Sequence, residues 1–359
     1  MKIINYGNTY EIYSDDLRTY DLLPAGTYKV AFDPMSGFSL VKVDNFVTLE
    51  EKIYGNHLEK IDKVLDSYDR FNRSLGVILS GDKGMGKSLF TQLLSQKAVE
   101  KELPVIMVTK AYPGVADFID KIKQDALIMF DEFEKVFSIS GGQGESQNNL
   151  LGLFDGTSQV KRLYAITVNN LRHVSEFMVS RTGRFHYHIR FDYPTASEIE
   201  IYLKDKIEEQ YYGEIKHVVA FANKVKLNYD SLRAIAFELN GGISFRAAIS
   251  DLNILATDTQ RYDIKVLFSD GKTATMTGQH MNLFQEKIRI DGYKDGGDYF
   301  SITFEGNKIK SEMNRMFVVG DDISSECMDE DGDKVTQYEV QGVEITRQQE
   351  RAVNYRLDY

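Results

Sequence analysis

Apolar residues recur along the chain in several distinct patterns, and each pattern predicts a different architecture. Within residues 1–48, short runs of strand type lie at 27–32 and 38–43, on either side of a connection that contains proline and glycine. Two such runs joined by turn residues are typical of an antiparallel hairpin. We therefore expect a small β-rich N-terminal domain, or an added β-layer, over residues 1–48.

The middle of the chain alternates apolar runs with segments of helical spacing. The apolar runs lie at 75–79, 104–109, 126–130, 163–168 and 189–191. An amphipathic helix is predicted at 51–70, where apolar residues recur every three or four positions. Strands that alternate with helices form a parallel sheet covered on both faces. The predicted fold class over residues 49–194 is therefore α/β.

The pattern becomes wholly helical after this region and then returns to strands. Thr195 is a suitable N-cap for a helix predicted at 197–211, and further helical spacing extends to about residue 255. Beyond it, short β-type runs are separated by Asp-Gly and Gly-Gly turns. We expect a helical lid at 195–258 and a β-rich C-terminal domain at 259–359.

The length, charge and cysteine count of the chain limit the kinds of protein that it can be. The 359 residues predict more than one domain, and 43 Lys+Arg against 54 Asp+Glu give a net charge of -11. This charge disfavours a chain-wide basic surface for nucleic acid but leaves a local patch open. Cys327 is the single cysteine, which indicates a reducing compartment. No apolar run approaches the roughly 18 residues of a membrane span, so we expect a cytoplasmic protein without membrane contact.

One glycine-rich stretch, GDKGMGKS at 81–88, fits the pattern G-x-x-x-x-G-K-[ST] between a predicted strand and a predicted helix. Its glycines let the backbone present N–H groups to phosphate oxygens, and the helix N-terminus favours negative charge. Lys87 is predicted to reach the β- and γ-phosphates of a nucleotide, and Ser88 to bind Mg²⁺. The predicted nucleotide-binding residues are Gly81, Asp82, Lys83, Gly84, Met85, Gly86, Lys87, Ser88 and Leu89.

Polar residues end two of the other predicted strands. Asp131 and Glu132 follow one strand, where an aspartate typically holds Mg²⁺ and a glutamate polarises the attacking water. Glu134 is a weaker substitute, because side chains alternate faces along an extended chain. Asn169 ends the next strand and is predicted to orient that water, with Asn170 as the competing candidate. These groups should meet, because ligands bind at the carboxyl ends of parallel strands.

Between about residues 51 and 256 the chain resembles an AAA+ ATPase of the AAA type. The resemblance rests on the phosphate loop, MFDEFE as the acidic box, NLLGLFDG, ITVNN as sensor 1, and SRTGRF as the arginine-finger motif. It implies Mg²⁺-dependent ATP hydrolysis in a homo-oligomeric ring, commonly a hexamer, in which Arg181 and Arg184 reach a neighbour's γ-phosphate. Thr182 replaces the usual proline of this motif, so the sequence leaves the pose of the loop open.

The same resemblance implies roles for three further places. Tyr54 and Gly55 fall where relatives contact adenine, although a lead-in to the following helix is the alternative. Arg246 lies where many relatives carry a sensor-2 arginine, with an ordinary surface arginine as the alternative. Residues 112–114 (YPG) lie where protein-threading relatives carry a pore loop, but the proline departs from the pattern and Pro-Gly is also an ordinary turn.

Together these features predict an ATPase ring that remodels or translocates a macromolecule. A protein substrate is favoured by the acidic chain and by residues 112–114. The alternative is a DNA-associated motor or loader, with Lys110, Lys121 and Lys123 facing a pore. A further alternative is a scaffold whose assembly depends on nucleotide binding rather than turnover. The domain plan is similar to that of AAA ATPases of tailed bacteriophages, which implies a location in the host cytoplasm.

Overall fold

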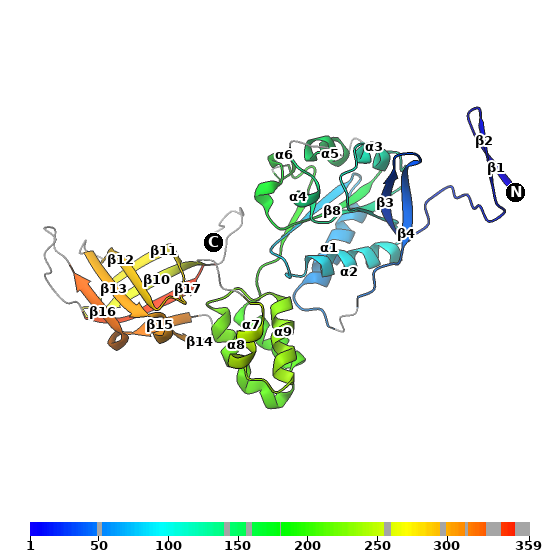
Figure 1. The fold of residues 1–359 in the computed structure, drawn as a ribbon. Helices are drawn as coiled ribbons and strands as arrows, with labels where there is room; N and C mark the ends of the chain where they lie inside the picture. Colours follow the sequence, from blue (N-terminus) through cyan, green and yellow to red (C-terminus); the bar gives the residue numbers. More distant parts are fainter. Residues whose placement is uncertain are drawn as a thin grey trace. The chain divides into compact units, whose positions relative to one another are not determined.

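The structure is a computed structural model of the chain, shown in Figure 1. The described residues are 1–48, 52–139, 144–155, 160–179, 181–254, 260–294, 299–312, 315–327 and 339–348. The chain divides into two compact units, Met1–Asp192 and Tyr193–Tyr359. This division falls close to the predicted end of the α/β domain at residue 194, and each unit is described by itself.

A mostly parallel sheet of seven strands is the centre of the first unit. Its strands follow the order β4-β3-β6-β7-β8-β5-β9, and every neighbouring pair except β3 and β4 is parallel. The strands are β3 (Thr27–Asp33), β4 (Gly37–Val43), β5 (Leu75–Ser80), β6 (Val105–Val108), β7 (Ala126–Phe130), β8 (Arg162–Val168) and β9 (Tyr187–Arg190). Every residue of β5, β7 and β8 is buried, as expected for strands covered on both faces.

Helices cover the sheet, with α1 and α2 on one side of β8 and α3, α5 and α6 on the other (Figure 1). They are α1 (His57–Arg70), α2 (Lys87–Glu100), α3 (Val115–Asp120), α4 (Phe133–Val136), α5 (Gln147–Phe154), η1 (Leu171–His173) and α6 (Glu176–Val179). Ile61, Leu65 and Tyr68 lie on one face of α1 and are buried, which explains the helical spacing in its sequence. The α/β fold predicted from the sequence, a parallel sheet covered by helices on both faces, is confirmed.

Of the two alternatives predicted for residues 1–48, the added β-layer describes β3 and β4 better than a separate domain does. In the part of the chain that the structure describes, β1 (Lys2–Tyr6) and β2 (Thr9–Tyr13) pair only with each other, whereas β3 pairs in parallel with β6. The sheet therefore continues through β3 to β4. The physical reason is that β6 would otherwise present an unpaired row of backbone N–H and C=O groups at the sheet edge.

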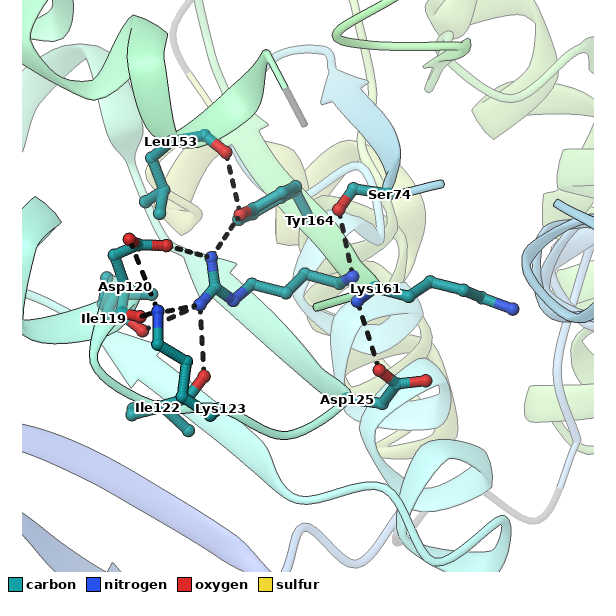
Figure 2. A network of polar contacts seen from close by, with 10 residues as sticks. Ser74, Ile119, Asp120, Ile122, Lys123, Asp125, Leu153, Lys161 and Tyr164 are labelled. Carbon is teal, nitrogen blue, oxygen red and sulfur yellow. Dashed lines mark hydrogen bonds and ion pairs between the residues drawn. The ribbon is translucent and has the colours of Figure 1, made fainter. Parts of the chain in front are cut away.

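A buried arginine on β8 binds the C-terminal end of α3. Arg162 begins β8 with 0% of its surface exposed, and its guanidinium group donates to the carbonyls of Ile119 and Ile122, both at 3.1 Å. It also pairs with Asp120 at 3.2 Å, and Figure 2 shows these groups around it. A positive charge is favourable beside the carbonyls that end a helix. Arg162 therefore fixes the position of α3, the helix that follows residues 112–114.

The second unit begins with the predicted helical lid. Its helices are α7 (Ala196–Lys206), η2 (Glu209–Glu214), α8 (Ile215–Ala222), α9 (Tyr229–Asn240) and α10 (Phe245–Asp251). Thr195 caps α7 in a reciprocal box with Glu198, which confirms the predicted N-cap. The predicted single helix over 197–211 is wrong after Lys206, because Ile207 takes an extended backbone and is buried.

The rest of the second unit is β-rich, as predicted. Two antiparallel sheets, β11-β10-β17-β15-β14 and β12-β13-β16, share one apolar core. Their strands are β10 (Gln260–Phe268), β11 (Thr273–Met281), β12 (Lys287–Tyr293), β13 (Tyr299–Glu305), β14 (Lys310–Glu312), β15 (Arg315–Val319), β16 (Ile323–Cys327) and β17 (Val340–Arg347). Arg347 ties this core to the lid by donating to the carbonyl of Ala222 at 2.8 Å. Among the described residues, no helix is both long enough and apolar enough to span a bilayer.

Candidate active site

The predicted phosphate loop connects β5 to α2 through glycines that no other residue replaces easily. Gly81 has a φ of 149°, and a β-carbon there would lie 2.4 Å from the carbonyl oxygen of Phe191. Gly86 has a φ of 93°, and a β-carbon there would lie 2.9 Å from Nε2 of His57. Gly86 is also the N-cap of α2. The loop therefore depends on glycine both for its backbone conformation and for its close packing.

Lys87 lies at the carboxyl edge of the sheet with only 8% of its surface exposed. Its ammonium group donates to the carbonyl of Asp82 at 2.8 Å and to Oδ1 of Asn169 at 2.9 Å. Burial lowers the pKa of Lys87, while the nearby carboxylates of Asp82 and Glu134 act in the opposite direction. Phosphate oxygens are the acceptors that such a lysine binds in a phosphate loop.

The hydroxyl group of Thr167 on β8 contacts the carboxylate of Asp131 and the backbone of Glu132, the two residues that follow β7. This hydroxyl donates to Asp131 at 2.6 Å and accepts from the backbone N–H of Glu132 at 2.8 Å. Asp131 is exposed, and Glu132 keeps 46% of its side chain exposed while it pairs with Lys135. The hydrogen bond from Lys135 holds the pKa of Glu132 below its usual range. The oxygens of Asp131 and Ser88 are of the kind that Mg²⁺ prefers, so these residues fit the predicted metal.

Asn169 and Asn170 have different roles in the structure. The backbone N–H and the side-chain amide of Asn169 donate to Oε1 of Glu134 at 2.9 and 3.1 Å, and its Oδ1 accepts from Lys87. Asn170 instead caps η1 by accepting from the backbone N–H of Arg172 at 3.0 Å. The asparagine beside the predicted phosphate site is therefore Asn169.

Comparison with known proteins agrees with this geometry. Residues 77–193 match the family described as ATPase family associated with various cellular activities (AAA). This part of the chain is thus similar to an AAA ATPase domain. No curated protein sequence matches the chain.

One solved structure similar to this chain is that of a mutant RuvB from Thermotoga maritima. The two chains are 16% identical, with a TM-score of 0.40, and the match covers 58% of this chain and 73% of that chain.

His57 lies between the predicted adenine-contacting segment and the phosphate loop. Nδ1 of His57 lies 2.9 Å from the carbonyl oxygen of Tyr54, and the ring packs against Gly86. Gly55 makes the turn before α1 with a φ of 76°. Arg246 is exposed on α10 in the second compact unit, so its predicted sensor-2 role stays a prediction.

The two arginines predicted to act as arginine fingers differ in their surroundings. Arg184 is only 7% exposed, and its guanidinium group pairs with the carboxylate of Asp155 and donates to the carbonyl of Phe177. The hydrogen bond from Arg184 holds the pKa of Asp155 below its usual range. Arg181 is exposed. The fork of Arg184 is thus engaged within its own chain, and Arg181 is the better candidate to reach a neighbour.

The YPG stretch forms a supported turn. The ring of Tyr112 packs against the rings of Phe32 and Phe38, with centroid distances of 5.5 and 6.3 Å. The backbone N–H of Gly114 donates to the buried carboxylate of Glu145 at 2.7 Å. These contacts tie the turn to the β3–β4 hairpin and to the segment before α5.

Sequence reasoning missed Thr167, His57 and Asp155 as contributors to the site. Thr167 had a local signal, since it stands two residues before Asn169 on a strand and therefore shares its face. Asp155 stands in the NLLGLFDG motif, but the motif did not indicate its pairing with Arg184. His57 had no signal, because the phosphate loop that it contacts lies far away in the sequence.

Proposed function

We propose that this chain is a Mg²⁺-dependent ATPase that works as a homo-oligomeric ring, commonly of six subunits. The observation that carries the proposal is the contact of Lys87 with Asn169 at 2.9 Å, directly beside the carboxylates that follow β7. A phosphate-binding cation, metal-binding oxygens and a candidate base thus lie at one edge of the sheet. The family match of residues 77–193 supports the same activity.

Each of these residues has a role in the proposed reaction. Bound MgATP supplies the phosphoryl group and the metal charge that the reaction requires. Lys87 binds its phosphate oxygens, while Asp131 and Ser88 hold the metal ion. Glu132 has a lowered pKa, so it is ionised at neutral pH and able to accept a hydrogen bond from the attacking water. Arg181 of one subunit completes the site of the next.

Two substitutions test this activity. Lys87→Ala should lose ATP binding, whereas Glu132→Gln should bind ATP but hydrolyse it at least about 10²-fold more slowly. Lys97→Ala, at the far end of α2, is the matched control and should keep wild-type turnover. Hydrolysis by Glu132→Gln at the wild-type rate would contradict the proposal. If the wild-type protein binds ATP but does not hydrolyse it, the result would instead support a scaffold whose assembly depends on nucleotide binding.

The ring is tested with the same Glu132→Gln variant, which should retain ATP. Analytical ultracentrifugation at saturating ATP and Mg²⁺ should show a closed oligomer, and electron microscopy should show its symmetry. A protein that stays monomeric under these conditions would contradict a site shared between subunits.

A protein is the first candidate for the remodelled substrate, because the net charge of -11 disfavours broad binding to nucleic acid. Unfolded model proteins should then stimulate ATP turnover. The ring of Tyr112 packs against Phe32 and Phe38, and this packing does not support a role in holding a substrate chain. Cytoplasmic location and the relationship to bacteriophage proteins stay predictions.

A specific observation favours DNA as the second candidate. Lys110, Lys121 and Lys123 are all exposed at the two ends of the short segment that contains α3. If they bind phosphates, DNA should stimulate ATP turnover, and added salt should weaken this effect steeply. A flat response to DNA at low salt would exclude this candidate.

A further inference from the structure

We propose that Glu134 is a positioning residue for hydrolysis, which fixes the orientation of the Asn169 side-chain amide. The inference rests on the proposed ATPase activity and adds a residue to its site. Glu134 is the second residue of α4, immediately after the carboxylates that follow β7. It touches Asn169 rather than the proposed nucleotide position, so it acts through that asparagine.

The amide of Asn169 lies between a group that only accepts hydrogen bonds and a group that only donates them. Its nitrogen is 3.1 Å from Oε1 of Glu134, and its oxygen is 2.9 Å from the ammonium nitrogen of Lys87. An ionised carboxylate has no donor, and an ammonium group has no acceptor. Only one of the two amide orientations satisfies both neighbours, with nitrogen towards Glu134 and oxygen towards Lys87.

A second hydrogen bond makes this arrangement rigid. The backbone N–H of Asn169 donates to the same Oε1 of Glu134 at 2.9 Å. One carboxylate oxygen thus holds both the main chain and the side chain at the end of β8. Hydrogen bonds to an ionised acceptor are stronger than neutral ones, so this contact restrains the amide more than a neutral residue would.

The fixed orientation gives Asn169 a defined chemical function. When Lys87 turns to phosphate oxygens, the amide oxygen loses its donor and is free to accept a hydrogen bond from the attacking water. Hydrogen bonding to Lys135, and also to Asn169, lowers the pKa of Glu132, which places the amide beside the proposed base as well. An amide without this restraint could also turn its N–H₂ group towards the water, which would then lack this acceptor.

The second oxygen of Glu134 supports a role other than packing. Oε2 is buried and accepts no hydrogen bond from the described residues. Leaving a buried acceptor without a partner costs about 1–3 kcal/mol, so an apolar residue would be the more stable choice for filling this space. The charge of Glu134 also favours the charged form of the buried Lys87 ammonium group.

The first test compares two variants of similar size. Glu134→Met removes both acceptors and should lower kcat for ATP by about 10–100-fold, because small errors of position are costly in catalysis. The dissociation constant for ATP and the melting temperature should stay near wild type. Glu134→Gln keeps one acceptor oxygen and should recover most of the rate. Glu100→Met, at the exposed end of α2, is the control and should behave as wild type.

The second test asks whether Glu134 acts through Asn169. In an Asn169→Ala background, Glu134→Met should have no further effect on kcat, whereas additive losses would contradict the proposal. Asn169→Asp should place two carboxylates in contact and lower kcat, and adding Glu134→Gln should restore part of the loss by supplying a donor. Failure of this isosteric pair to recover any rate would also overturn the proposal.

The outcomes separate this inference from the proposed activity. If the wild-type protein hydrolyses ATP and Lys87→Ala does not, the activity stands. Unchanged kcat in Glu134→Met then rejects the positioning role alone. If the wild-type protein neither binds nor hydrolyses ATP, the proposed activity itself is rejected.

Discussion

The guanidinium group of Arg184 pairs with the carboxylate of Asp155 within the first compact unit. Two of its nitrogens face the two carboxylate oxygens, and Nη2 lies 2.8 Å from Oδ2. Paired, planar contacts of this kind are the strong form of an arginine–carboxylate bond. The residue that the family resemblance assigns to a neighbour's phosphate thus has a partner in its own chain.

Replacing Arg184 should therefore lower the stability, whereas replacing Arg181 should lower ATP turnover. Arg184→Ala leaves the carboxylate of Asp155 without its partner and should lower the free energy of unfolding by about 2–3 kcal/mol, since one partner of the pair is partly solvated. Arg181→Ala should leave the melting temperature unchanged but lower ATP turnover of the assembled protein by about 10³-fold. Thermal denaturation and steady-state ATPase assays measure both effects. Equal loss of stability in the two variants would contradict this division.

Two glycine-to-alanine substitutions should differ in their effects: one should lower the affinity for ATP, and the other should raise the stability. Gly81→Ala places a β-carbon 2.4 Å from the carbonyl of Phe191, so the phosphate loop must shift and ATP affinity should fall. Gly152 lies exposed within α5 with open space around it, so Gly152→Ala should raise the stability by about 0.5–1 kcal/mol. Isothermal titration with ATP and chemical denaturation check the pair. A wild-type ATP affinity in Gly81→Ala would show that the loop relaxes freely.

A fall in pH should lower the free energy of unfolding of the first unit, partly because of His57. Burial lowers the pKa of His57, and the hydrogen bond to the Tyr54 carbonyl opposes this shift only in part. Below about pH 6.5 the unfolded chain binds a proton that the folded chain resists, so the free energy of unfolding falls as the pH falls. Burial lowers the pKa of His188 too, so it contributes in the same direction. His57→Gln should show a smaller decrease than wild type in urea denaturation between about pH 7 and 5.5.

The aromatic contacts of Tyr112 predict a role in stability. Tyr112→Ala removes a ring that packs on Phe32 and Phe38 and should lower the free energy of unfolding by about 1–2 kcal/mol. Tyr112→Phe keeps the ring and should remain close to wild type. Urea denaturation gives both values. If Tyr112→Ala instead kept full stability while losing protein-stimulated ATP turnover, a gripping role would be the better explanation.

The strands around the site were predictable because their sequences are unambiguous. The run at 126–130 is wholly apolar and is followed by two carboxylates, and the structure has β7 at Ala126–Phe130. Periodicity and strand-end chemistry together therefore predicted the sheet edge at which Lys87, Asp131 and Asn169 meet.

The position of Glu134 was not predictable by the same rules. Alternation of faces along an extended chain made it a weak candidate, but α4 begins at Phe133 and turns its side chain towards Asn169. The burial of Arg162 had no signal either. Arg162 donates to the backbone carbonyls of Ile119 and Ile122, and backbone groups leave no trace in the sequence.

The pairing of β3 with β6 also constrains the order in which the first unit folds. During synthesis, β3 and β4 are made before α1, β5 and α2, and the partner of β3 is made only after them. The edge of β3 in the β3–β4 hairpin therefore stays unpaired until β6 has left the ribosome. Contacts between such distant segments slow folding and expose strands that associate with other chains. Protection of this hairpin during synthesis would thus favour the yield of folded protein.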